Sequence, residues 1–186
     1  MHNKILNKYY FINEFNQSYI NKQHKETTII YRNYDQKVDE KIITKIKSFC
    51  RKKGNKFLLS NNIKLAIKLN LDGVYIPSFN KDKKHLSYSL KKKFIILGSA
   101  HNIYEIRTKE TQNVNAIFLS SLFKKNKNFL GIHKFKLLTL LSKKPFIPLG
   151  GISNKNLKKL TLINARCFAG ISIFEQKKAP KKGPFC

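Results

Sequence analysis

Short apolar runs alternate with amphipathic stretches along the chain, at intervals of roughly 20 to 25 residues. Most of the runs are continuously apolar, which is typical of parallel strands covered on both faces. Strand-then-helix order with eight strands predicts an α/β fold, a compact (β/α)8 TIM barrel, and a doubly wound open sheet is the alternative. The predicted strands are KYYFI at 8–12 and residues 27–32, 56–60, 72–77, 94–99, 116–121, 145–151 and 168–172.

The stretches between these runs predict helices at residues 38–50, 62–69, 102–110, 134–142 and 154–162. Asp35, Asn61 or Asn62, and Asn154 stand where a helix N-cap would accept hydrogen bonds from free backbone N–H groups. A chain of 186 residues is short for such a barrel, so we expect trimmed loops and a final helix that is short or missing. Residues 1–174 then form one barrel domain, and 175–186 form a basic C-terminal tail.

The chain carries a formal net charge of +28, and positive charge favours binding to nucleic-acid phosphates. Its lysines, however, occur in almost every segment, and arginine occurs at only four positions. Because phosphate and base readers tend to use the planar guanidinium group, we favour solvated lysine faces and keep a nucleic-acid surface as the alternative. The positive potential attracts phosphorylated substrates in either case.

Lysines interrupt every apolar run, so no stretch reaches the roughly 18 to 20 residues that a membrane helix requires. The first residues show no apolar segment followed by a small-residue cleavage site, and we expect a cytoplasmic protein. Cys50, Cys167 and Cys186 are odd in number and widely spaced, which indicates free thiols rather than a disulfide framework or a zinc site.

Two glycine-containing segments follow the last two predicted strands. In a barrel, the loops after strands seven and eight commonly hold a phosphate. PFIPLGGIS ends in Gly150 and Gly151, whose bare backbone lets N–H groups face an anion. FAGIS offers the amides of Ile171 and Ser172 and the Ser172 hydroxyl at the next strand end. Together these segments predict a phosphate site.

Residues 27–174 contain four segments, KFLLSNNIKLAIKLNLDGVYIPS, FIILGSAHN, PFIPLGGIS and AGISIFE, that together resemble the thiamine phosphate synthase/TenI family. KFLLSNNIKLAIKLNLDGVYIPS is similar to the stretch in which a strand ends in an Asn-Asp pair and a Gly-Val-His-Leu strand follows. FIILGSAHN resembles its Ser-Thr-His segment, with Ser99 and His101 in place; PFIPLGGIS resembles its Gly-Gly-Ile phosphate turn; and AGISIFE resembles its Val-Ser-Ala-Ile strand. The resemblance implies a barrel of thiamine biosynthesis that binds phosphorylated thiazole and pyrimidine molecules.

The sequence departs from the family where a synthase holds magnesium and pyrophosphate. The Asn-Asp pair reads Ser60 and Asn61, and the later Asp reads Asn80. Mg²⁺ prefers anionic oxygens, so the amides argue against the metal that the resemblance implies for a synthase. Of the Gln-Leu-Arg-x-Lys motif only Arg32 remains, with Tyr34 in the lysine position.

The Thr-x-Thr-Lys loop after strand six reads Lys125, Asn126, Lys127, Asn128. These lysines could neutralise pyrophosphate in place of a metal. Pro77, in place of a Gly-Gln-x-Asp loop, looks more like the TenI branch, whose members bind thiazole phosphate without metal.

His101 is the candidate proton-transfer residue, since a neutral imidazole suits that role; capping or packing at a helix start is the alternative. Ser99 either bonds substrate or packs at its strand end. Surface positions are expected for the remaining histidines, His2, His24, His85 and His133.

Three hypotheses for the function follow. The first is a synthase that condenses hydroxymethylpyrimidine diphosphate with thiazole phosphate. The second is a TenI-like thiazole phosphate tautomerase that uses His101. The third is an inactive barrel that binds a phosphorylated ligand, or RNA through its basic surface. The sequence leaves the oligomeric state open, a homo-oligomer included.

Overall fold

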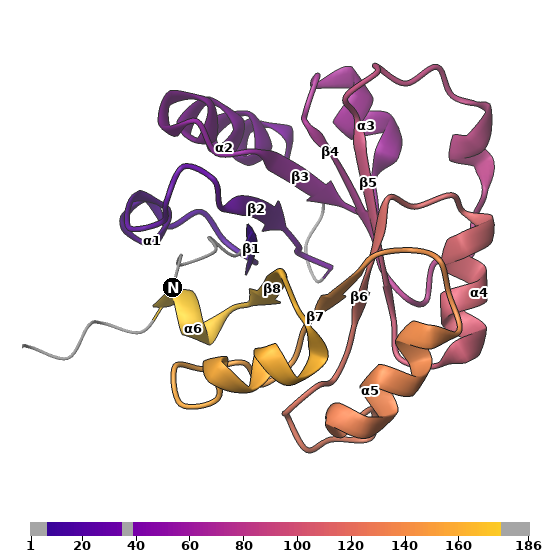
Figure 1. The fold of residues 1–186 in the computed structure, drawn as a ribbon. Helices are drawn as coiled ribbons and strands as arrows, with labels where there is room; N and C mark the ends of the chain where they lie inside the picture. Colours follow the sequence, from indigo (N-terminus) through magenta and orange to yellow (C-terminus); the bar gives the residue numbers. More distant parts are fainter. Residues whose placement is uncertain (1–6, 35–38, 176–186) are drawn as a thin grey trace, which may run out of the picture.

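Eight parallel strands form a closed barrel in the computed structural model, which describes residues 7–34 and 39–175 (Figure 1). The strands are hydrogen-bonded in the order β7-β6-β5-β4-β3-β2-β1-β8, and a parallel bridge between Leu149 and Ala169 joins the two ends. The predicted (β/α)8 barrel is therefore confirmed, and the open-sheet alternative is wrong. The strands are β1 (Asn7–Ile12), β2 (Thr28–Tyr31), β3 (Phe57–Ser60), β4 (Gly73–Ile76), β5 (Ile95–Ala100), β6 (Ala116–Leu119), β7 (Phe146–Pro148) and β8 (Cys167–Gly170).

The outer ring of helices is trimmed, as expected for a barrel of this length. Between β4 and β5 there is only a 3-10 turn, and the segment after β7 is also a 3-10 helix. Within the described residues the last helix has four residues, in agreement with the expectation of a short one. The basic tail lies outside the described residues apart from Glu175. The helices are α1 (Gln17–Asn21), α2 (Glu40–Lys53), α3 (Ile63–Lys68), η1 (Lys84–Ser87), α4 (Ile103–Thr111), α5 (Gly131–Leu140), η2 (Leu157–Ile163) and α6 (Ser172–Glu175).

Asparagine and aspartate side chains start several of these helices. Asn62 caps α3 by accepting from the Leu65 N–H, and Asn102 caps α4 in the same way. Asp39 caps α2 by accepting from the Lys41 N–H. Asp35, the predicted cap, lies outside the described residues. The prediction for Asn154 is wrong, because η2 begins three residues later.

Asn156, and not Asn154, is the asparagine that hydrogen-bonds to the backbone of this segment. It stabilises a turn and does not cap a helix. Its Oδ1 accepts from the Ser153 N–H at 2.9 Å and its Nδ2 donates to the Gly151 carbonyl at 2.8 Å. A side chain that bonds its own preceding turn competes with helix formation. The segment after β7 therefore forms a turn first, and its 3-10 helix begins only at Leu157.

Aromatic rings fill the interior of the barrel. Phe11 lies 5.1 Å from Tyr75 and 5.2 Å from Phe118, and Tyr75 lies 5.7 Å from Phe118, as ring centroid distances in edge-to-face geometry. Tyr9 adds a further edge contact to Phe118 at 5.4 Å. The interior set contains one fully buried residue from each strand: Phe11, Ile30, Leu58, Tyr75, Leu97, Phe118, Ile147 and Ala169.

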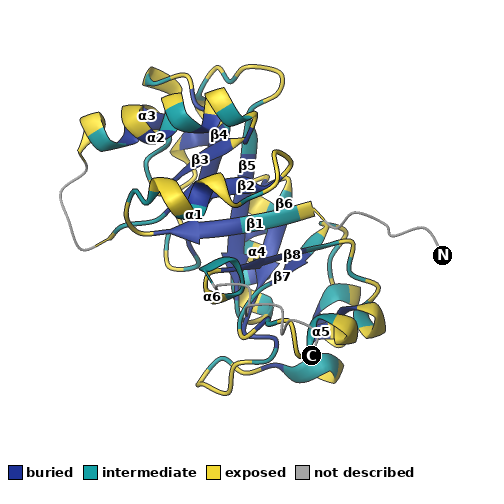
Figure 2. Cartoon of the chain, turned by 90° about the vertical axis from the view of Figure 1, so that its left-hand side faces the viewer, coloured by how far each residue is buried: buried dark blue, intermediate teal, exposed yellow. Residues whose placement is uncertain are grey.

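The opposite faces of the strands pack against the helices in a second, outer layer of core. On α2 this layer is formed by Ile43, Ile46 and Cys50, while the charged face of the helix points to solvent. Figure 2 shows the strands buried at the centre and exposed positions on the outer surfaces of the helices. Both faces of each strand are thus covered, which explains the continuous apolar runs of the sequence.

Two basic side chains depart from the expected surface position. His85 is buried, so its predicted surface placement is wrong: its Nε2 lies 2.8 Å from the Gln112 carbonyl. Lys109 has no exposed surface. Both belong to a polar network that links α4 to the loop after β4.

Cys50 and Cys167 are free thiols, and burial raises their pKa values to about 12 and about 11. At neutral pH they are protonated and poor nucleophiles. Cys186 lies outside the described residues. None of the helices described here is both long and apolar enough to span a membrane.

We expect the Phe118→Ala variant to lose about 3–5 kcal/mol of unfolding free energy, because it empties the centre of the barrel interior. Urea denaturation followed by circular dichroism measures this loss. The matched control is Leu137→Ala on α5, where the side chain is 63% exposed and the expected change is within about 0.5 kcal/mol. Equal losses in the two variants would contradict the assigned interior.

Candidate functional site

The carboxyl ends of the eight strands meet at one mouth of the barrel, because all strands are parallel. At this mouth Gly150 and Gly151 form the turn after β7, with φ angles of 99° and 74°. A Cβ on Gly151 would lie 2.4 Å from the Lys124 backbone nitrogen, so no larger residue fits there. The sequence requires glycine at this turn both for its backbone conformation and for its close approach to the β6 loop.

The loop after β6 is bonded directly to this glycine turn. The Gly150 carbonyl accepts from the N–H groups of Phe123 and Lys124, at 2.8 and 3.3 Å. The loop folds back on itself, since the Ser121 N–H donates to the Asn128 carbonyl at 2.9 Å. Lys125 and Lys127 are exposed within this loop. The structure therefore brings two predicted basic residues to the loop that borders the glycine turn.

The end of β8 adjoins the same turn. The bridge between Leu149 and Ala169 sets Gly150 and Gly151 beside Gly170 and Ile171. Within the described part of the chain, the N–H groups of Gly151 and Ile171 have no protein acceptor. Ser172 is exposed next to them. Free N–H groups from two neighbouring loops are a feature that suits an anion, and the phosphate site stays a prediction.

A chain of hydroxyl groups crosses the floor of the mouth. The Tyr75 hydroxyl donates to Ser99 Oγ at 2.8 Å inside the barrel. Ser60 Oγ donates to the Tyr34 hydroxyl at 3.1 Å, and Arg32 interacts with both phenols. Burial raises the pKa of Tyr75 to about 12, so this phenol is a hydrogen-bond donor at neutral pH. Ser99 is buried and bonded internally, which favours its packing role.

Arg32 also lies over the Phe11 ring, with its Cζ 5.2 Å from the ring centroid. It borders a cleft of about 360 Å³ that Phe11, Glu14 and Ile171 also line. The cleft connects the ends of β1, β2 and β8. Arg32 is thus placed to meet an anion that enters this side of the mouth.

Asn61 and Asn80, the two positions of the family's acidic residues, are in direct contact. Asn80 Nδ2 donates to Asn61 Oδ1 at 2.6 Å. This bond engages the amide oxygen of Asn61, and neither of the two side chains supplies negative charge. Among the described residues no group of three His, Cys, Asp or Glu side chains could hold a metal ion. The residues present do not fit a protein-bound Mg²⁺.

His101 is half-buried at the end of β5 and is paired with a carboxylate. Glu105 Oε2 accepts from the His101 backbone N–H at 2.7 Å and lies 2.8 Å from its Nδ1. A carboxylate at Nδ1 fixes the ring orientation and leaves Nε2 available to receive or give a proton. The helical spacing of four residues places Glu105 on the first turn of α4, so the pair is a local feature of the sequence.

Lys109 and Gln112 hold the loop after β4 from the side of α4. The Lys109 ammonium donates to the carbonyls of Pro77 and Asn80 and to Gln112 Oε1, each at 2.8 Å. Gln112 Nε2 donates to the carbonyls of Asn80 and Asp82, at 3.0 and 2.8 Å. Every donor of the buried ammonium therefore has an acceptor.

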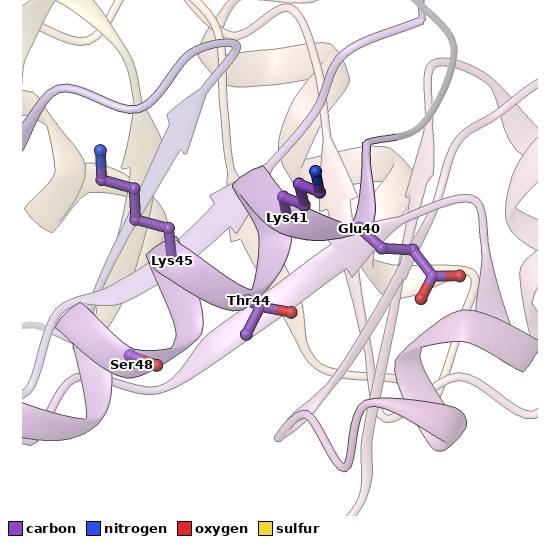
Figure 3. Close-up of a pocket in the computed structure, with 5 residues that line it drawn as sticks. All are labelled: Glu40, Lys41, Thr44, Lys45 and Ser48. Carbon is purple, nitrogen blue, oxygen red and sulfur yellow. The ribbon is translucent and has the colours of Figure 1, made fainter.

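Away from the mouth, the hollow drawn in Figure 3 lies along the outer face of one helix. Its lining residues all come from α2 and include Lys41, Lys45 and Ser48 (Figure 3). No second element converges on it. The barrel mouth, where loops from several strands meet, is the better candidate site.

The closed barrel and its strand-end loops define a (β/α)8-barrel protein whose site lies at the mouth. The family model described as thiamine monophosphate synthase matches residues 18–174. The protein therefore belongs to the thiamine monophosphate synthase family, and its role in thiamine biosynthesis is thiamine phosphate synthase-like.

Individual relatives agree with this membership. The chain is 24% identical to the thiamine-phosphate synthase of Lactococcus lactis subsp. cremoris over 165 residues, covering 86% of this chain and 75% of that protein. It is 29% identical to the Persephonella marina thiamine-phosphate synthase, covering 68% and 63%. Thiamine phosphate pyrophosphorylase from Pyrococcus furiosus superposes with a TM-score of 0.76 at 16% identity, covering 92% of each chain.

The fold by itself is shared more widely. FabK from Thermotoga maritima superposes with a TM-score of 0.71 at 11% identity, covering 91% of this chain and 59% of that one. Barrels of this kind host many chemistries, so the argument for function depends on the residues at the mouth.

Sequence reasoning missed three residues that shape the mouth. Tyr75 stands where the similar stretch has His, and its place in an apolar strand concealed the hydroxyl. Lys109 and Gln112 lie in and just after a helix where both look solvated. Only the three-residue spacing of Lys109 and Gln112 signals their shared face, and that signal does not reveal burial.

The pH dependence of stability offers a test of Lys109. Burial lowers the pKa of Lys109 from 10.5 to about 8. Between these values the unfolded chain binds a proton that the folded chain lacks, so this group makes stability rise with pH, by up to about 1.4 kcal/mol per pH unit. Urea unfolding of the wild type and of Lys109→Met between about pH 7 and 9.5 measures the effect.

The comparison of the two proteins removes the opposing contributions of Cys50 and Tyr75, whose raised pKa values make stability fall in alkali. We expect the free-energy difference to shift in favour of the wild type above about pH 8. A difference that is constant with pH would show that Lys109 titrates normally.

Proposed function

We propose that this protein condenses hydroxymethylpyrimidine diphosphate with thiazole phosphate to form thiamine phosphate. The bond between the pyrimidine methylene carbon and the diphosphate oxygen breaks, and the diphosphate leaves with the electron pair. The methylene carbon then bonds to the thiazole nitrogen, which supplies its lone pair. The observation that supports this reaction is the glycine turn bordered by a basic loop, at the same barrel mouth as Arg32, in a member of the synthase family.

The proposed roles follow from the chemistry of each group. Gly150, Gly151, Ile171 and Ser172 bind the thiazole phosphate through backbone N–H groups and a hydroxyl. Arg32, Lys125 and Lys127 neutralise the negative charge that develops on the leaving diphosphate. Ser60, Asn61 and Asn80 supply hydrogen bonds next to it.

Charge neutralisation by side chains takes the place of a protein-bound metal in this proposal. The resemblance to a synthase implies Mg²⁺, yet the bonded amides of Asn61 and Asn80 offer it no anionic ligand. Three cationic side chains at the mouth provide the positive charge that the leaving group requires.

The His101 pair favours a second candidate, a thiazole phosphate tautomerase. Glu105 holds the imidazole so that Nε2 can take a proton from one ring position of the substrate and return it to another. This reaction requires the phosphate turn and the imidazole, and it has no diphosphate leaving group. The loss of acidic residues at Asn61 and Asn80 would not affect it.

Formation of thiamine phosphate from both substrates distinguishes the candidates. We expect product with Mg²⁺ and also with EDTA, because no protein ligand set for the metal is found in the described residues. Chromatography of thiamine phosphate measures the rate in both conditions. Absence of product in both conditions overturns the synthase proposal. Aromatisation of thiazole phosphate that His101→Ala abolishes would then establish the tautomerase.

The phosphate site is tested by Ser172→Asp. A carboxylate beside the glycine turn repels a phosphate, and we expect the affinity for thiazole phosphate to fall at least about tenfold. Isothermal titration calorimetry measures the affinity. Ser48→Asp makes the same charge change on the outer face of α2 and should leave binding within about twofold. Equal effects of the two variants would mean that net charge, and not a local site, governs binding.

Cytoplasmic location, homo-oligomer formation and the single-domain division at residue 174 stay predictions, as does RNA binding. Size-exclusion chromatography with light scattering determines the oligomeric state. Retention of an oligonucleotide that disappears with salt would support the RNA alternative.

A further inference from the structure

The loop after β4, residues 77–82, contributes two contacts across the barrel mouth. Phe79 lies edge-on to Tyr34 with ring centroids 5.5 Å apart, and Asn80 bonds Asn61 at 2.6 Å. Both contacts join the β4 loop to the loops after β2 and β3. Phe79 is 62% exposed, so little packing of its own side chain holds it in place. The backbone of this loop must be fixed by something else.

The buried Lys109 network fixes that backbone. Its ammonium binds the carbonyls of Pro77 and Asn80, which lie on either side of Phe79, and Gln112 binds Asn80 and Asp82. Four hydrogen bonds from two side chains thus reach three carbonyls of one short loop. A loop held in this way keeps one backbone conformation without a helix beneath it.

Such an anchor is expensive to bury. Taking an ammonium group out of water costs several kcal/mol unless its donors are all bonded. The barrel also makes room for it, because a Cβ on Gly98 would lie 2.7 Å from Lys109 Cδ. An apolar side chain would fill the same space at lower cost. The Lys109 ammonium is therefore explained by its hydrogen bonds to the carbonyls of the β4 loop.

We propose that Lys109 is a positioning residue that, together with Gln112, fixes the β4 loop so that Phe79 and Asn80 form a preformed wall of the substrate site. Lys109 touches no substrate and acts through the loop. Its effect on loop order is independent of the reaction, while its effect on catalysis rests on the proposed function.

The absence of tryptophan from the sequence makes loop order measurable. Phe79→Trp places a single tryptophan on the loop, which is excited selectively over the eight tyrosines. We expect Lys109→Met in this background to lower the fluorescence anisotropy and to raise acrylamide quenching about twofold, because the loop loses its anchor. The matched control is Lys53→Met, which removes another ammonium that binds three backbone carbonyls, of Ile20, Asn21 and Gln23, on the side of α1 and α2.

Unchanged anisotropy and quenching in the Lys109 variant overturn the proposal, and so does an equal change in the Lys53 control. If Lys109→Met loses its circular dichroism spectrum, Gln112→Met decides instead. It removes the two bonds to the carbonyls of Asn80 and Asp82 and the bond from Lys109, and it keeps the side-chain volume. The proposal then requires that acrylamide quenching in Gln112→Met exceed the quenching in the Lys53→Met control.

The kinetic measurement uses the native Phe79 background. For an anchor of the binding wall we expect KM for the pyrimidine diphosphate to rise about tenfold with kcat within about twofold. A fall in kcat alone contradicts the proposal. If the wild type makes no thiamine phosphate, the proposed reaction is wrong, and the fluorescence comparison still determines whether Lys109 orders the loop.

Discussion

The interior of the closed barrel is the constraint on which the rest of the structure depends. Eight strands leave an interior just wide enough for side chains, and here three aromatic rings, Phe11, Tyr75 and Phe118, occupy it in mutual edge contact. Because Tyr75 carries a hydroxyl at the far end of its ring, the same residue packs the core and begins the polar floor of the mouth. Arg32 lies over Phe11 at that floor. Core and site therefore share residues, and a change of interior packing changes the site.

A trimmed outer ring shifts part of the stabilisation from helix packing to bonded lysines. Where a helix is missing after β4, Lys109 and Gln112 bind the carbonyls of the loop. On the other side of the barrel Lys53 binds carbonyls at the end of α1. Such bonds satisfy backbone groups that a longer helix would satisfy internally. Most lysine side chains face solvent, yet Lys53 and Lys109 stabilise the fold by binding backbone carbonyls.

The mouth combines a half that we propose to bind anions with a half that carries the bonded amides of Asn61 and Asn80. The glycine turn, the β8 end and the basic loop after β6 lie together. At the positions where the resemblance implies acidic metal ligands, Asn61 and Asn80 bond each other and carry no charge. In the proposed synthase reaction cationic side chains neutralise the diphosphate, and in the proposed tautomerase reaction the oriented His101 transfers the proton.

The sequence alone determined the barrel, since continuous apolar runs at a regular interval reflect local burial on two faces. It also determined the glycine turn, whose positive φ angles only glycine adopts easily, and the caps Asn62 and Asn102, which bond within their own first turn. Only the tertiary structure decided that Lys109 and His85 are buried and that Asn61 meets Asn80. These contacts join residues from different loops or depend on what covers a helix face, and no local pattern encodes either.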